Sequence, residues 1–256
     1  MKPHQLNSVE PLWQLSDFDA HVQAALLEAH IDLSSPSSGL KRITWNSSPL
    51  IGSVLGIDLS REHNGKSFSD TSAIERYTRG SDLVARYPEN QSQPYSLEAY
   101  WRVSVPQTDH VQIDSIVSLQ TSLLESYPTA QTVTSLAAHE AWFVPSDGTK
   151  ARMLANELNA EQTTTSDDFA GILLRSKEGG WSYLEGTQVS DLGTWQADWD
   201  KSGKWTMKRF LGGEFQEKGV IRRLRVRGIF LPQEGDIESA PHLLSEFASS
   251  PPPLTV

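Results

Sequence analysis

The sequence predicts a mainly β protein, built as a large antiparallel β-sandwich or as two packed β-sheets, with one or two peripheral helices. Three observations support this prediction. Apolar and polar residues alternate along several segments, clusters of Gly, Pro, Asn and Ser separate those segments, and eight tryptophans can fill a core. At 256 residues the chain can bury roughly three quarters of its unfolded surface, so it needs no disulfide or metal for stability.

Residues 1–39 are expected to form a helical segment followed by a linker. Ser16 and Asp19 have the spacing of a weak capping box. Apolar residues then recur at helical spacing along a narrow stripe, namely Phe18, Val22, Ala25, Leu26 and Ala29. The Ser-Ser-Pro-Ser-Ser-Gly run at 34–39 would end this helix, which we expect to lie on a sheet.

Residues 40–130 are expected to form a first β-rich half. Its clearest strand is 95–105, where apolar and polar side chains alternate over the whole segment. Strands are also expected at 77–87 and 111–119, and short polar connections would join the three into an antiparallel meander. The strongest turn signal in this half is His63-Asn64-Gly65-Lys66.

Residues 131–234 are expected to form a second β-rich half, followed by a tail at 235–256. The expected strands are 170–175, 181–186, 194–199, 204–211 and 220–231, with tight turns at 178–180 and 201–203. In the tail, a short helix is expected within 239–248, before an end that contains three consecutive prolines.

The two halves are candidates for an internal duplication. Setting Arg79 against Arg175 also aligns Tyr87 with Tyr183. The remaining identities are Glu89 with Glu185 and, after a two-residue gap, Ala99 with Ala197 and Trp101 with Trp199. Shared strand composition explains these identities nearly as well, so both explanations stay open. A duplication would give two similar sheets that pack together.

Composition excludes several classes of function. The chain has 22 Lys and Arg against 32 Asp and Glu, a formal net charge of −10, so we expect no nucleic-acid partner. The absence of cysteine excludes thiol nucleophiles, zinc–thiolate sites and iron–sulfur clusters. There is no phosphate loop, dinucleotide fingerprint or nucleophile elbow. No metal site is predicted, because the seven histidines lack ligand spacing. An all-carboxylate calcium site stays open as an alternative, although no Asp-rich loop has the EF-hand spacing, and no cofactor is expected. Without a leader or a spanning apolar run, we expect a cytoplasmic protein and no membrane partner.

The polar face of the strand at 95–105 is the first candidate site. Glu98, Tyr100 and Arg102 project together from it, because side chains two residues apart share a face. An acid, a phenol and a guanidinium could take part in general acid–base catalysis on a sugar. A solvated cross-strand ladder is the alternative interpretation.

An arginine stripe is the second candidate. Arg223, Arg225 and Arg227 alternate with apolar residues along one strand, so the three guanidiniums share a face and can bind a carboxylate, sulfate or phosphate. The alternative is pairing with acids from neighbouring strands, for which the candidates are Glu214, Glu217, Asp198 and Asp200.

Tryptophan is the third candidate, because an indole face can stack on a sugar ring. Trp101, Trp195 and Trp199 have the strand register of core residues. Trp181 follows Gly179-Gly180, and we expect it to be the most exposed indole.

Together these features predict a non-catalytic ligand-binding or interaction protein for a carbohydrate or a small anion. Two alternatives stay open: a carbohydrate-active enzyme with dispersed carboxylates, Glu98 first among them, and a structural subunit of an oligomer. A protein partner or a homo-oligomer is compatible with these interpretations. The Trp-rich, two-halved pattern resembles that of large carbohydrate-active β-sandwiches, a likeness that implies fold and not function.

Overall fold

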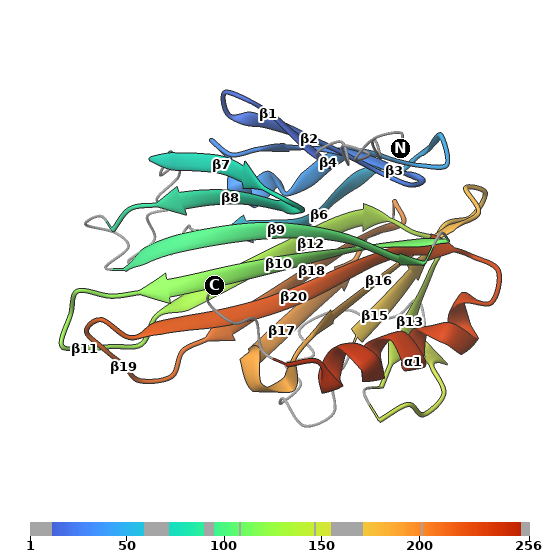
Figure 1. Cartoon of the computed structure of the whole chain (residues 1–256). Helices are drawn as coiled ribbons and strands as arrows, with labels where there is room; N and C mark the ends of the chain where they lie inside the picture. Colours follow the sequence, from blue (N-terminus) through green and yellow to red (C-terminus); the bar gives the residue numbers. More distant parts are fainter. Residues whose placement is uncertain are drawn as a thin grey trace, which may run out of the picture.

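Two antiparallel sheets pack face to face and hold the core between them (Figure 1). The computed structural model describes residues 12–58, 72–89, 95–107, 109–145, 147–154, 171–200 and 202–251. Within these residues each large sheet has nine strands. The mainly β fold with two packed sheets is therefore confirmed. The turn expected at 63–66 lies outside the described residues.

The first sheet has the strand order β1-β2-β3-β4-β6-β12-β18-β17, with β5 paired to β4. Its strands are β1 (Trp13–Ser16), β2 (Asp19–Ala24), β3 (Leu27–Asp32), β4 (Leu40–Trp45), β5 (Ser48–Pro49), β6 (Gly52–Asp58), β12 (Thr129–Ala137), β17 (Leu192–Trp199) and β18 (Lys204–Gly212).

The second sheet has the order β14-β13-β15-β16-β20-β10-β9-β8-β7. Its strands are β7 (Glu75–Arg79), β8 (Asp82–Tyr87), β9 (Ser96–Gln107), β10 (His110–Gln120), β13 (Glu140–Val144), β14 (Arg152–Met153), β15 (Gly171–Arg175), β16 (Trp181–Thr187) and β20 (Ile221–Pro232). A small separate pair joins β11 (Glu125–Ser126) to β19 (Gln216–Glu217). Both large sheets thus contain strands from before and after residue 130, so neither sheet coincides with one half of the sequence. The duplication itself stays a prediction.

The structure overturns the prediction of an N-terminal helix. The expected helical residues form β1, β2 and β3 instead, and the 34–39 linker contains a 3₁₀ turn, Pro36–Ser38. The buried residues here alternate along two strands, and a two-residue turn at 25–26 shifts the alternation from even to odd positions. That shift places apolar residues three and four apart, which imitates a helix. The two alanines of the stripe, Ala25 and Ala29, strengthen the helical pattern, because alanine is a strong helix former.

Tryptophans and tyrosines hold the two sheets together. Trp101 on β9 is completely buried, as predicted, and its indole N–H donates to the carbonyl of Leu55 on β6 at 3.3 Å. The Tyr87 hydroxyl donates in the same way to the carbonyl of Leu33 at 3.0 Å. These contacts bridge the sandwich, because Leu55 lies in the other sheet and Leu33 directly follows its strand β3. Trp195 is also buried, whereas Trp199 is only partly so and packs edge-on against Trp205.

A buried ion pair also crosses the core. Arg209 on β18 is completely buried, and its Nε lies 2.8 Å from Oε1 of Glu185 on β16. The hydroxyls of Tyr183 and Thr134 both donate to the other oxygen of Glu185, at 2.7 Å and 2.5 Å. Burial is the main cause that raises the pKa of Tyr183 well above its ordinary value, followed by the Glu185 charge, so this phenol stays protonated and donates.

The single α-helix of the described residues, α1 (Asp236–Ser249), covers part of the outer face of the second sheet (Figure 1). Its buried side chains include Leu244 and Phe247, which pack on apolar residues of β13, β15, β16 and β20. This helix matches the one expected within 239–248. None of the described helices has the length and apolar character that a bilayer crossing requires.

Candidate functional site: an arginine face on the second sheet

Strands β7, β8, β9, β10 and β20 place three rows of side chains on the outer face of the second sheet, beside the area that α1 covers. The rows follow from the register, because directly opposed residues of neighbouring strands share a face. The charged row is Arg79, Asp82, Arg102, Asp114 and Arg227. The aromatic row is Tyr77, Val84, Tyr100, Ile116 and Arg225. The mixed row is Glu75, Arg86, Glu98, Ser118 and Arg223. We call these fifteen positions the arginine face.

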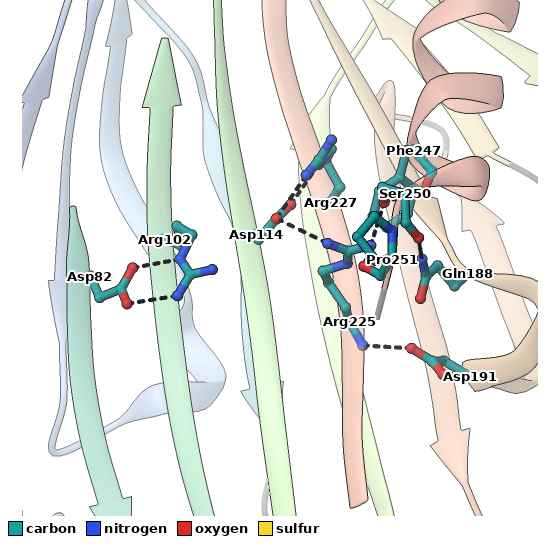
Figure 2. Close-up of polar contacts among 10 residues, drawn as sticks. All are labelled: Asp82, Arg102, Asp114, Gln188, Asp191, Arg225, Arg227, Phe247, Ser250 and Pro251. Atoms are coloured by element: carbon teal, nitrogen blue, oxygen red, sulfur yellow. Dashed lines mark hydrogen bonds and ion pairs between the residues drawn. The ribbon is translucent and has the colours of Figure 1, made fainter. Parts of the chain in front are cut away.

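The charged row contains two bidentate ion pairs, shown side by side in Figure 2. Nε and Nη2 of Arg102 lie 2.7 Å and 2.9 Å from the two oxygens of Asp82. Nε and Nη2 of Arg227 lie 2.6 Å and 2.8 Å from the two oxygens of Asp114. The hydrogen bond to Asp82 raises the pKa of Arg102. Donors and acceptors thus alternate across four strands, at the spacing of about 4.8 Å that separates neighbouring strands.

The aromatic row forms a small apolar cluster. Val84, Tyr100 and Ile116 are buried against one another, and Tyr77 packs on them. The Tyr100 hydroxyl donates a hydrogen bond to the Glu98 carboxylate in the mixed row. Burial, helped by that bond, raises the pKa of Tyr100 to about 12, so the phenol is neutral at ordinary pH. This row supplies an apolar strip with charged residues on either side.

The mixed row contains polar atoms without a hydrogen-bond partner among the described residues. These atoms are the buried Oγ of Ser118 and the buried Nε of Arg223, which stands directly opposite Ser118. The Arg223 guanidinium lies over the Tyr100 ring, 5.6 Å from its centroid. Buried polar atoms without partners are rare in proteins, so an ordered water is expected beside these two atoms.

The C-terminal end of α1 borders the face at Arg225 (Figure 2). Nη2 of Arg225 donates to Ser250 Oγ at 2.6 Å, and the ring of Phe247 lies 4.7 Å below its guanidinium. The backbone N–H of Arg225 donates to Asp191, which belongs to the 3₁₀ turn Val189–Asp191. Burial is the main cause that lowers the pKa of Arg225 and that raises the pKa of Asp191. The Arg225 side chain is therefore buried and held in place at the border of the face. Arg102, with 42% of its side chain exposed, is open to solvent.

Six of the seven residues singled out from the sequence lie together on this face, namely Glu98, Tyr100, Arg102, Arg223, Arg225 and Arg227. The sequence predicted two separate strand faces. In the structure β10 lies between β9 and β20, so the two faces form one surface. The expected acid partners of the arginine stripe are wrong. Asp114 pairs with Arg225 and Arg227, and among the expected partners Glu214 pairs instead with Arg222, on the opposite side of the strand.

Trp181 lies elsewhere and is only 4% exposed, so the prediction that it is the most exposed indole is wrong. The two glycines before it have the opposite effect to the one expected. A side chain at Gly179 would lie 2.4 Å from Nε1 of Trp181, so glycine lets the indole fold over the turn. Trp181 lines a hollow of about 360 Å³, together with His139, Lys177 and Ile51.

Two aspartates of the site, Asp82 and Asp114, were missed by sequence reasoning. Each is the only acid in its strand that faces the arginines, and neither belongs to a motif. A signal was present in the second case. Asp114 is the one acid in a segment with apolar residues at 111, 113, 116, 117 and 119, and an acid inside a buried strand demands a cationic partner.

The arrangement is better suited to holding a ligand than to moving a proton. Both buried aspartates are held in bidentate pairs, and the neutral Tyr100 already donates to Glu98. Carboxylates accept hydrogen bonds from hydroxyl groups, guanidiniums donate to them, and tyrosine rings contact apolar C–H surfaces. A face with all three properties can bind a polyhydroxylated molecule.

No protein-family model matches the chain, and no curated protein matches it. Among solved structures it is similar to a candidate aldose 1-epimerase from Klebsiella pneumoniae subsp. pneumoniae MGH 78578, with a TM-score of 0.56 and 9% identity, over 91% of this chain and 84% of that one. It is also similar to alpha-N-acetylgalactosaminidase NagBb from Bifidobacterium bifidum in its Gal-NHAc-DNJ complex, with a TM-score of 0.51 and 13% identity, over 86% of this chain and 36% of that one. The chain thus spans about a third of the length of NagBb. At these identities the similarity shows a shared β-sandwich fold.

Proposed function

We propose that this chain is a non-catalytic carbohydrate-binding protein that takes an acidic oligosaccharide on the arginine face. The observation that carries the proposal is the order of the three rows, in which an apolar tyrosine strip lies between two rows of charged side chains. A sugar ring has the same division, with C–H groups on its faces and hydroxyls around its edge. The names of both similar structures concern sugars, which supports the ligand class.

An acidic sugar fits the charge of this face. The three rows carry six arginines, namely Arg79, Arg86, Arg102, Arg223, Arg225 and Arg227. They carry four carboxylates, namely Glu75, Asp82, Glu98 and Asp114. The face therefore has an excess of two positive charges on a chain whose net charge is −10. Arg223 is the natural anchor for a carboxylate or sulfate group, because its guanidinium has no ion-pair partner among the described residues, whereas Arg225 and Arg227 are paired with Asp114.

The test is a direct binding measurement. A panel of neutral, uronate-containing and sulfated oligosaccharides is screened on an array, and the best ligand is then titrated by calorimetry. We expect Arg223→Ala to weaken binding at least about tenfold, since a hydrogen bond to a charged group contributes about 1.5–3 kcal/mol. Tyr100→Ala should also weaken it, whereas Tyr100→Phe keeps the ring and should weaken it less.

Arg222→Ala is the matched control. Arg222 precedes Arg223 on the same strand, carries the same charge and faces the other way, where it pairs with Glu214. This variant should leave the dissociation constant within about twofold. Equal losses in Arg222→Ala and Arg223→Ala would place the ligand elsewhere. Binding of neutral sugars only would refute the acidic class, and conversion of the ligand to a product would favour an enzyme.

A further inference from the structure

We infer that the outer face of the first sheet carries a binding site for a divalent transition-metal ion, with zinc as its simplest occupant, formed by His21, Glu28 and His30. One ligand atom from each of these side chains lies within 4.8 Å of the other two. Two imidazoles and a carboxylate are an established ligand set for zinc, which binds nitrogen at about 2.0–2.1 Å and carboxylate oxygen at about 2.0–2.2 Å. This site is on the other sheet from the arginine face and does not depend on the proposed function.

A tight hairpin brings the three ligands together. Strands β2 and β3 are joined by a two-residue turn, and their register places His21 directly opposite His30, with ring centroids 4.6 Å apart. Glu28 lies two residues before His30 and so shares its face. The opposite face of the hairpin anchors the backbone, because Val22 and Ala29 there are completely buried in the core. The ligands thus project from a fixed frame.

The distances require only a small adjustment. Tetrahedral zinc with bonds of about 2.0–2.1 Å places its ligand atoms about 3.3 Å apart. Nε2 of His21 already lies 3.1 Å from Oε1 of Glu28. The side chains of His21 and Glu28 are 21% and 52% exposed, so both can rotate to close the remaining separation. Three protein ligands leave at least one coordination position open to water or to another molecule.

Asp19 is placed to position His30. Its Oδ2 lies 3.3 Å from Nδ1 of His30, and a carboxylate there favours the tautomer that has its proton on Nδ1 and the lone pair on Nε2. Two cations of the neighbouring strand β4 are each matched by an aspartate, which limits their repulsion of a metal ion. Arg42 lies 3.1 Å from Asp19, and Lys41 lies 3.8 Å from Asp32.

The sequence prediction of no metal site rested on the linear spacing of the histidines. His21 and His30 are nine residues apart, a spacing that matches no ligand motif, and only their pairing across the hairpin makes them neighbours. The prediction of no metal site stays untested, and the cross-strand geometry favours a metal site instead.

The experiment is a zinc titration of the tag-free chain after treatment with a chelator, followed by calorimetry and by competition with a chromophoric chelator. We expect one equivalent of Zn²⁺ per chain. His21→Gln and His30→Gln should each weaken binding by more than about tenfold, and Asp19→Asn by about tenfold, the lower end of the effect of a carboxylate behind a ligating histidine. Substituted Co²⁺ should show the absorption bands of a coordinated ion and lose them in the two histidine variants.

His242→Gln is the matched control. Nε2 of His242 lies 3.1 Å from Oε1 of Glu246 on the exposed side of α1, the same contact as between His21 and Glu28 but without the second imidazole. This variant should leave zinc affinity unchanged. If His242→Gln weakens binding as much as His21→Gln, or if neither hairpin variant weakens it, the site is refuted. Circular dichroism confirms folding, and Glu28→Gln provides a further variant at an exposed position.

Discussion

At the scale of single residues, the buried Arg209–Glu185 pair is a contact with a large consequence for stability. It joins β18 to β16 across the core, and Glu185 also accepts hydrogen bonds from Tyr183 and Thr134. Removing one partner of a buried pair costs more than the pair contributes, because the remaining charge keeps its desolvation penalty. The pair therefore fixes how the two sheets are aligned.

We expect Glu185→Gln to lower the free energy of unfolding by about 3–5 kcal/mol. The double variant Glu185→Leu with Arg209→Met should lose less than this single variant, since it removes both charges. Urea unfolding at pH 7 measures both, and the exposed-pair variant Glu246→Gln serves as the control with a loss under about 1 kcal/mol. A double variant less stable than Glu185→Gln would contradict this account.

Trp101 provides a second prediction at this scale. Its indole is completely buried, and its N–H bonds to the carbonyl of Leu55 on the other sheet. Trp101→Ala should therefore cost about 3–5 kcal/mol in unfolding free energy, measured by the same urea titration. A loss under about 1 kcal/mol would overturn the register that places Tyr100 and Arg102 on the outer face.

At the scale of elements, α1 is attached to the second sheet by a charged contact as well as by its apolar face. Arg175 on β15 lies 2.8 Å from Glu140 on β13 and 2.9 Å from Asp236 in the first turn of α1. Glu140 also accepts from the indole N–H of Trp142 at 3.1 Å. That hydrogen bond and the Arg175 guanidinium lower the pKa of Glu140 below its ordinary value.

The sign of the resulting pH dependence follows from the lowered pKa. A carboxyl whose pKa is lowered by folding stabilises the protein above its unfolded pKa, about 4.3 for glutamate, and this stabilisation is lost as the pH falls through the folded pKa. Glu140→Gln should therefore be less stable than the unchanged protein at pH 6–7, and the difference should shrink below pH 4. Urea midpoints at pH 7, 5 and 3.5 measure it, and a constant difference would contradict the assignment.

Element by element, the sequence predicts five strands of the second sheet well, namely β9, β10, β15, β16 and β20. It is wrong at 77–87, where one expected strand is a hairpin of β7 and β8, and it does not predict β13 or β14. It predicts the first three strands of the chain poorly. The segment 95–105 has eleven residues of unbroken alternation, and all of them except Tyr95 belong to β9. In contrast, β2 and β3 are six residues each, and their alternation is interrupted by a turn. The site divides in the same way. Alternation within a strand places Glu98, Tyr100 and Arg102 on one face. Pairing between strands brings Asp114 and the arginines of β20 beside them, and the order of strands in a sheet cannot be read from one strand.

At the scale of the whole molecule, the arginine face is a positive region on a negative protein. The net charge of −10 repels an acidic ligand at long range, whereas the face attracts it at contact. Salt screens both effects, over a distance of about 10 Å at 0.1 M.

We therefore expect the two rate constants for an acidic oligosaccharide to change together as salt rises from 50 to 500 mM. The association rate constant should rise because long-range repulsion is screened, and the dissociation rate constant should rise more because contact attraction is weakened. Affinity should fall at least about threefold. Stopped-flow measurements at several salt concentrations test this, and an association rate constant that falls with salt would show that the face, and not the net charge, dominates at long range.

The position of β20 has a consequence for how the chain is made. It is the last strand in the part of the chain that the structure describes, yet it lies in the middle of the second sheet, between β16 and β10. During synthesis β16 and β10 must therefore keep unpaired backbone edges until residues 221–232 emerge, and such edges invite association between chains. A nascent chain that stops before residue 221 would have two unconnected half-sheets and no native topology.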